Sequence, residues 1–149
     1  MKTRDEIRAT TFEAAETLDI EKPRLREWIS RKYIVPAEPS IGRGTKAYLD
    51  RINHYQIAVF DHLVRRGISR EIASFVVRGL RKTDLEAAMA RPFPLFISLV
   101  SFKDSNFEQS TIFSSDEYHL KLVTEDVQVD FGMIVDITEI IKAVDRRLP

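Results

Sequence analysis

The chain has no cysteine among its 149 residues, and this absence excludes several kinds of site at once. Without thiols there is no disulfide framework, no thiolate metal site and no cysteine nucleophile. Long apolar runs are also missing, and none approaches the roughly 18 apolar residues that a membrane-spanning helix needs. Residues 1–6 are charged and no apolar segment follows them, so no secretory signal is expected. We therefore expect a cytoplasmic protein that does not associate with membranes.

Net charge is absent as well, but the two signs are unevenly distributed along the chain. Residues 1–91 contain 18 Lys and Arg against 13 Asp and Glu, whereas residues 92–149 contain 5 against 10. The first part therefore has an excess of positive charge, and the second part has an equal excess of negative charge. Such an asymmetry indicates an anion-binding part joined to an acidic part with a different role.

Glycine is scarce, yet two of the five glycines flank one arginine in the stretch PSIGRGTKAYL. Prolines and glycines exclude a regular helix from about residue 35 to residue 46. Short extended pieces are expected on either side, at residues 34–35 and 47–49. The pattern predicts a small hairpin, here called the wing, with Arg43 at its tip.

Two short helices are expected before the wing. Thr10 and Glu13 have the spacing of a capping box, which opens the first helix. The second begins near Glu21, with Pro23 in its first turn. Its apolar residues share one face at i, i+3 and i+4: Leu25, Trp28 and Ile29. Two short helices with so tight a turn between them are typical of a helix-turn-helix.

Three further helices are expected between the wing and residue 91. One starts near Asp50 and ends at Gly67, and the next is capped by Ser69. The third covers residues 83–90 and ends before two prolines. We place a domain boundary at residues 91–94.

The apolar period changes from 3.6 to 2 after this boundary, which predicts three or four antiparallel strands. Residues 95–102 form a continuous apolar run, residues 118–122 and 127–131 alternate, and residues 108–113 are a weaker candidate. The predicted fold class is therefore α+β. An N-terminal winged helix-turn-helix domain, residues 1–91, precedes a small antiparallel sheet with a C-terminal helix, residues 92–149.

The C-terminal helix has an apolar stripe at helical spacing, and Asp136 or Thr138 could cap it. Its members are Ile137, Ile140, Ile141, Val144 and Leu148. The stripe could pack partly on the sheet and partly on a second copy, or it could simply cover its own sheet. About 55 residues is small for a unit with both a core and a ligand cavity, so we favour dimerisation over effector sensing.

The predicted DNA-binding surface combines the outer face of the second helix with the wing. Basic residues on a helix can enter the major groove and contact phosphates and base edges, and Glu27 could accept from a cytosine amino group. A solvated helix face without a partner is the alternative. The predicted DNA-binding residues are Lys22, Arg24, Arg26, Glu27 and Arg31 on the helix, with Arg43, Lys46 and Tyr48 on the wing.

Residues 12–80 resemble the N-terminal DNA-binding domain of the MerR family of bacterial transcription regulators. The matching motifs, in the order in which the family has them, are Leu25-Arg26-Glu27-Trp28, Ile34-Val35-Pro36, the wing from Arg43 to Tyr48, and Gly67-Ile68-Ser69. The resemblance implies a winged helix-turn-helix in a homodimer, with Arg26 and the wing on the DNA backbone.

The chain departs from the family pattern in three respects. The family usually has an arginine beside the wing tyrosine or two positions before it, whereas Ala47 precedes Tyr48 here, so Arg43 or Lys46 has to take that role. No long coiled-coil helix is apparent. The lack of cysteine excludes sensing of metals or superoxide through thiolates.

We therefore predict a sequence-specific transcription regulator that binds double-stranded DNA as a homodimer, needs no cofactor and is not an enzyme. A small-molecule effector and RNA polymerase stay open as further partners. Two alternatives also stay open. One is a protein-interaction module built on a winged-helix fold, and the other is an excisionase-like architectural DNA binder.

Three polar residues, His54, Asp61 and His62, lie roughly along one side of the third helix and are candidates for a metal site. Two histidines and a carboxylate are suitable ligands. Residues two turns apart on one helix, however, lie about 10 Å apart along its axis, too far for a single ion. No catalytic or metal-binding residues are therefore expected.

Overall fold

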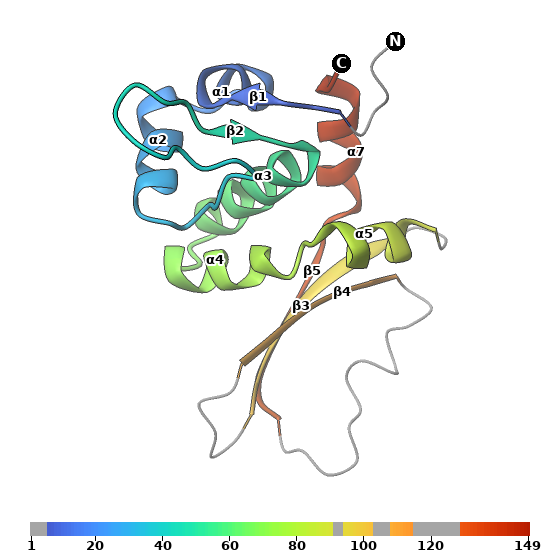
Figure 1. Ribbon diagram of the computed structural model, residues 1–149. Coiled ribbons are helices and arrows are strands. Elements are labelled where there is room, and N and C mark those ends of the chain that lie inside the picture. Colours follow the sequence, from blue (N-terminus) through green and yellow to red (C-terminus); the bar gives the residue numbers. More distant parts are fainter. Residues whose placement is uncertain (1–5, 91–93, 103–107, 115–128) are drawn as a thin grey trace. The chain divides into compact units, whose positions relative to one another are not determined.

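The computed structural model describes residues 6–90, 94–102, 108–114 and 129–149 (Figure 1). Its helices and small antiparallel sheets confirm the predicted α+β class. The chain divides into two compact units, Met1–Ser74 with Ile140–Pro149, and Phe75–Glu139. The boundary expected at residues 91–94 falls inside the second unit, and the end of the chain belongs to the first. Within the described ranges, no helix is long and apolar enough to cross a membrane.

The first unit begins with the predicted helix-turn-helix, α1 (Thr11–Leu18) and α2 (Lys22–Ser30). The capping box is confirmed, because the Glu13 N–H donates to Thr10 Oγ1 (3.3 Å) and the Thr10 N–H donates to the Glu13 carboxylate (2.7 Å). Asp19 ends α1 in the left-handed conformation, with φ of 55°. This reversal produces the tight turn that the spacing predicted.

The α2 helix packs through its apolar face onto α3 (Arg51–Arg65), which Asp50 caps. Trp28 and Phe60 are buried and meet edge to face, with ring centroids 4.8 Å apart. Leu25, beside Trp28 on the same face, is fully buried. Because this face is fixed in the core, the opposite face of α2 is directed to solvent.

The wing closes through a different strand pairing from the one predicted. Tyr48 and Glu38 exchange two backbone hydrogen bonds, and β2 (Tyr48–Leu49) pairs with β1 (Ala9–Thr10), a strand that the sequence did not suggest. Residues 34–35 are not a strand. The side chain of Asn53 accepts from the Ala37 N–H (2.8 Å) and donates to the Val35 carbonyl (2.9 Å), so this stretch is held by α3 instead.

The end of the chain joins the first unit through α7 (Thr138–Arg147). Asp145 accepts from Arg51 Nη2 (2.8 Å) and from the Tyr55 hydroxyl, both on α3. Burial and the bond to Asp145 hold the pKa of Tyr55 above its ordinary value, so the hydroxyl remains a donor. This polar cluster attaches α7 to the helix-turn-helix core.

Replacing Asp145 with alanine should remove this attachment and destabilise the first unit by about 2 kcal/mol, because the buried Tyr55 hydroxyl loses its acceptor. Urea unfolding measures the loss, and amide exchange should show α7 opening first. Asp145→Asn keeps one acceptor oxygen and should cost less. Equal stability of the alanine variant and the native chain would contradict the role given to Asp145.

The second unit is a three-stranded antiparallel sheet in the order β4-β3-β5. The strand β3 (Leu95–Phe102) has the predicted bounds, and β4 (Glu108–Ser114) agrees with its prediction to one residue. The last strand, β5 (Val129–Asp136), extends beyond the expected 127–131. The strand predicted at residues 118–122 lies outside the described residues.

Two helices accompany this sheet. The second half of α4 (Arg70–Arg78) belongs to this unit, where Ser110 Oγ donates to the Val76 carbonyl (2.7 Å), and α5 (Lys82–Met89) packs against β4. At the start of α7, Asp136 accepts from the Thr138 N–H (2.9 Å) and Thr138 Oγ1 accepts from the Leu95 N–H (2.8 Å). Asp136, one of the two residues expected to cap this helix, therefore accepts from its first backbone N–H.

Candidate nucleic-acid interface

The outer face of α2 and its C-cap residue present three exposed arginines, Arg24, Arg26 and Arg31. Residues two positions apart on a helix point about 200° apart, so Arg24 and Arg26 leave opposite flanks of α2. Arg31 lies two turns beyond Arg24 and returns to the same flank. The helix therefore has cations along both sides of its solvent-facing surface.

Lys22 and Arg24 make side-chain contacts within the helix-turn-helix. Lys22 Nζ is 3.2 Å from the ring centroid of Phe12 and 3.7 Å from Glu16 Oε1. The Arg24 guanidinium carbon lies 6.0 Å from the Trp28 ring centroid, at the limit of a cation–π contact. Lys22 is half-buried, so of these two residues Arg24 offers more charge to a partner.

Glu27 is the acidic residue of this face, and two arginines share it. Its Oε1 lies 3.2 Å from Arg31 Nε and 3.1 Å from Arg70 Nη1 at the start of α4. The carboxylate therefore neutralises part of the basic surface in the absence of a ligand. The predicted contact of Glu27 with a cytosine amino group would compete with both ion pairs.

Among the predicted DNA-binding cations, three are exposed and have no ion pair, hydrogen bond or aromatic contact to any of the described residues: Arg26, Arg43 and Lys46. A paired cation has to give up its partner before it can bind a phosphate, whereas these three do not. They are therefore the side chains best suited to contact DNA at little cost.

The wing tip is a compact turn that exposes Arg43. Thr45 donates its N–H (3.1 Å) and its hydroxyl (2.7 Å) to the Gly42 carbonyl, and its hydroxyl oxygen accepts from the N–H of Ile41 (3.0 Å). Gly44 has φ of 84°, a conformation that glycine adopts without strain. Ile41, 90% exposed, projects beside Arg43 and gives the tip an apolar as well as a basic group.

Tyr48 lies at the base of the wing, where it meets a residue that the sequence did not single out. The Arg8 guanidinium lies 3.4 Å from the Tyr48 ring centroid and forms two hydrogen bonds with the Glu38 carboxylate, at 2.8 and 2.9 Å. The Arg8 bond holds the pKa of the Glu38 carboxyl below its ordinary value. Tyr48 is half-buried beneath this pair. Its side chain therefore supports the base of the wing and is only partly accessible to a partner.

The apolar stripe assigned to dimerisation is largely covered within the chain itself. Ile137, Ile141 and Val144 are buried, and Ile140 and Leu148 are half-buried. Only the last two retain accessible surface for a second copy. Assignment of this stripe to dimerisation stays a prediction.

The three candidate metal ligands on α3 have separate environments. His54 is buried, Asp61 pairs with Arg65 of its own helix (2.8 Å), and His62 is half-buried. Over the part of the chain that the structure describes, no three metal-ligating side chains gather at one point.

Comparison of the chain with models of known protein families and with characterised proteins found no match.

Glu27→Gln should strengthen binding to DNA of any sequence by about fivefold at low salt, because exposed ion pairs of the kind it removes are worth up to about 1 kcal/mol. Arg31 and Arg70 would then be available to phosphates. Fluorescence anisotropy with a duplex of random sequence measures the change. Asp61→Asn is the matched control, since it also removes a carboxylate that pairs with an arginine four residues on. A loss of affinity confined to sites with cytosine at one position would instead identify Glu27 as a base reader.

The buried His54 predicts a dependence of stability on pH. Burial lowers its pKa below the ordinary 6.5, although its hydrogen bond to the Asp50 carbonyl acts in the opposite direction. The Asp50 charge also acts to raise this pKa. Among the described residues, Glu6, Arg8 and Glu13 line the pocket beside His54. As the pH falls below about 6.5, the unfolded chain takes up a proton that the folded chain does not. Stability should therefore fall with pH in this window, and His54→Asn should reduce that slope in urea unfolding. An unchanged slope would contradict the burial of a neutral His54.

Proposed function

We propose that the first unit is a DNA-binding domain and that the chain acts as a sequence-specific transcription regulator. The observation that carries this proposal is the exposed Arg26 on the outer face of α2, together with Arg43 and Lys46 on the wing, all three without a partner among the described residues. A helix-turn-helix places such a helix in the major groove, and a wing extends the contact to the neighbouring backbone.

Charge supports an anionic partner for this unit. The first unit contains 17 Lys and Arg against 12 Asp and Glu, whereas the second contains 6 against 11. The excess of positive charge therefore belongs to the unit with the helix-turn-helix, and an excess of this sign accelerates association with DNA.

Each part of the surface has an expected role. Arg24 and Arg26 leave opposite flanks of α2, so each can contact one wall of a major groove that is about 12 Å wide. Arg43 and Lys46 bind backbone phosphates beside the groove. The exposed Ile41 adds an apolar contact at the edge of the minor groove.

Two copies are expected to bind one operator, as the MerR-like resemblance implies. Two-fold symmetric regulators contact half-sites about one helical turn apart, and their operators are inverted repeats. Ile140 and Leu148, the accessible part of the α7 stripe, are the surface proposed for pairing.

Selection from a random duplex library, followed by fluorescence anisotropy at several salt concentrations, tests the proposed function. We expect enrichment of an inverted repeat, and a dissociation constant that rises steeply with salt. Bending of the duplex without sequence enrichment would instead support the architectural alternative. Absence of DNA binding at low salt would contradict the proposal and favour the protein-interaction module.

A further inference from the structure

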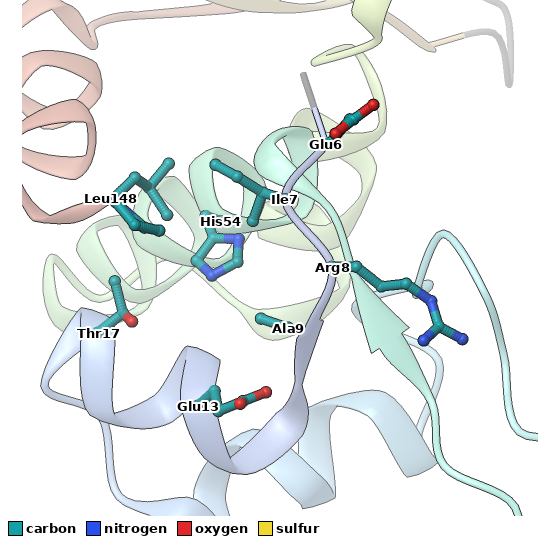
Figure 2. A pocket seen from close by; sticks show the side chains of 9 residues that line it. Glu6, Ile7, Arg8, Ala9, Glu13, Thr17, His54 and Leu148 are labelled. Atoms are coloured by element: carbon teal, nitrogen blue, oxygen red, sulfur yellow. The ribbon is translucent and has the colours of Figure 1, made fainter. Parts of the chain in front are cut away.

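The first unit contains a pocket of about 420 Å³ between the N-terminal segment, α1, α3 and the end of the chain (Figure 2). Its lining includes Ile7 and Ala9 on one side, Glu13 and Thr17 of α1, His54 of α3 and Leu148. All these residues belong to one compact unit. The wall formed by the N-terminal segment continues into β1, which pairs with β2 at the base of the wing.

His54 lines this pocket, and one nitrogen of its buried ring has no partner among the described residues. Its ring is 1% exposed, and its Nε2 has no hydrogen-bond partner among the described residues. Figure 2 shows the ring directed toward the space between Thr17, Glu13 and Ala9. A buried polar atom without a partner is costly, and native proteins usually satisfy such an atom.

The opposite ring nitrogen determines what Nε2 can do. His54 Nδ1 lies 2.6 Å from the Asp50 carbonyl oxygen, which can only accept, so Nδ1 carries the proton and donates. Burial lowers the pKa of His54, so the ring is neutral near pH 7. Nε2 therefore has a free lone pair, and its missing partner has to be a hydrogen-bond donor.

The remaining lining selects the kind of donor. Ile7, Ala9 and Leu148 supply apolar walls, Glu6 supplies a carboxylate, and the Glu13 carboxylate, which is bonded to Thr10, adds negative charge. The guanidinium of Arg8 points away from the pocket in Figure 2 and is bound to Glu38. The pocket therefore favours a molecule that combines an apolar body with positive charge.

We propose that this pocket binds a small amphiphilic amine, whose ammonium group donates to His54 Nε2 and whose apolar body contacts Ile7 and Leu148. The proposal does not depend on DNA binding, because it uses residues that are not part of the α2 and wing surface. It concerns a ligand site in a unit to which the sequence assigned DNA binding and, through the C-terminal apolar stripe, dimerisation.

Nuclear magnetic resonance of the imidazole ring in the full-length chain tests this proposal, with benzylamine as the probe. A ligand of this size is expected to bind in the millimolar range, so titration to about 20 mM is sufficient. Benzylamine should shift the His54 Nε2 resonance in a saturable manner. Benzoate, an anion of similar size without a donor, should leave it unchanged.

Two substitutions separate the Nε2 acceptor from the structural role of the ring. His54→Asn can keep a side-chain N–H for the Asp50 carbonyl but has no atom at the Nε2 position, so affinity should fall about tenfold or more. His54→Gln can place its amide oxygen near the Nε2 position and should retain part of the affinity. Because both variants lack the imidazole, saturation by benzylamine is followed in them by the backbone amide signals of residues 7–9.

Three results would overturn the proposal. One is an unchanged Nε2 resonance across the benzylamine titration. This result would also be seen if a bound water satisfied Nε2 and the amine did not displace it. The second is equal binding of benzylamine and benzoate. The third is equal affinity of the native chain and His54→Asn, which would show that the amine does not use Nε2.

Discussion

The double variant Arg26→Ala/Arg43→Ala should bind its DNA site about 100-fold more weakly at low salt for each copy bound, because each charge-assisted contact is worth about 1.5 kcal/mol or more. The slope of log affinity against log salt should also become shallower by about two for each copy bound, since each copy releases two fewer counterions. Anisotropy titrations at four or five salt concentrations give both quantities.

The physical reason for so large an effect is that both side chains are exposed and unpaired within the described part of the chain. Neither forms an ion pair with a described residue, so folding should be unaffected by their removal. Loss of binding would therefore reflect lost DNA contacts alone. Circular dichroism and the unfolding midpoint verify that the fold is intact.

The matched control is Arg146→Ala/Arg147→Ala, which removes the same charge from exposed positions at the end of α7. These residues lie in the same unit but outside the predicted surface. We expect less than about a threefold loss from their general contribution to the field. Equal losses in the two double variants would show that net charge, and not the α2 and wing surface, determines binding.

Trp28→Ala should destabilise the first unit by about 4 kcal/mol, since removal of a buried aromatic side chain costs its transfer energy and leaves a cavity. Trp28 is 1% exposed and contacts Phe60 edge to face. It joins α2 to α3, so DNA binding should fail together with the fold. Urea unfolding at constant temperature measures the change.

Trp28→Phe is the informative companion to this variant. The indole N–H has no hydrogen-bond partner among the described residues, so phenylalanine loses no such bond. Its cost should be roughly half that of alanine or less, because most of the aromatic volume is kept. An alanine variant that loses less than about 1 kcal/mol would contradict the burial of the Leu25 and Trp28 face.

The sequence predicted the features that depend on local spacing. The capping box of Thr10 and Glu13, the short turn before Glu21 and the start of α3 at Asp50 all depend on residues within one turn of each other. Such short-range signals are retained in the folded chain because they satisfy helix ends whatever the surroundings.

Contacts between residues far apart in sequence were not predicted. Arg8 reaches Glu38 and Tyr48 across some 30 positions or more, and Asp145 reaches Arg51 across 94. The sequence of a two-residue strand such as β1 does not indicate which strand it pairs with. The wing hairpin was misassigned for the same reason, because Asn53 binds the backbone at Val35 and Ala37.

The C-terminal helix shows how far a periodic pattern can be interpreted. Its five apolar residues correctly predicted the helix, and three of them are buried within the chain. Periodicity identifies the face that is covered but not what covers it. The sequence could not show that residues 140–149 join the first unit and not the sheet.

Amide chemical-shift mapping of the full-length chain with its selected DNA duplex tests the central claim most directly. The largest shifts should fall on residues 22–32, which cover α2 and the two residues after it, and on residues 40–46 of the wing. The strands β3 and β5 should be unaffected. Shifts confined to the second unit, or spread evenly over exposed lysines and arginines, would contradict the assignment of α2 and the wing to DNA.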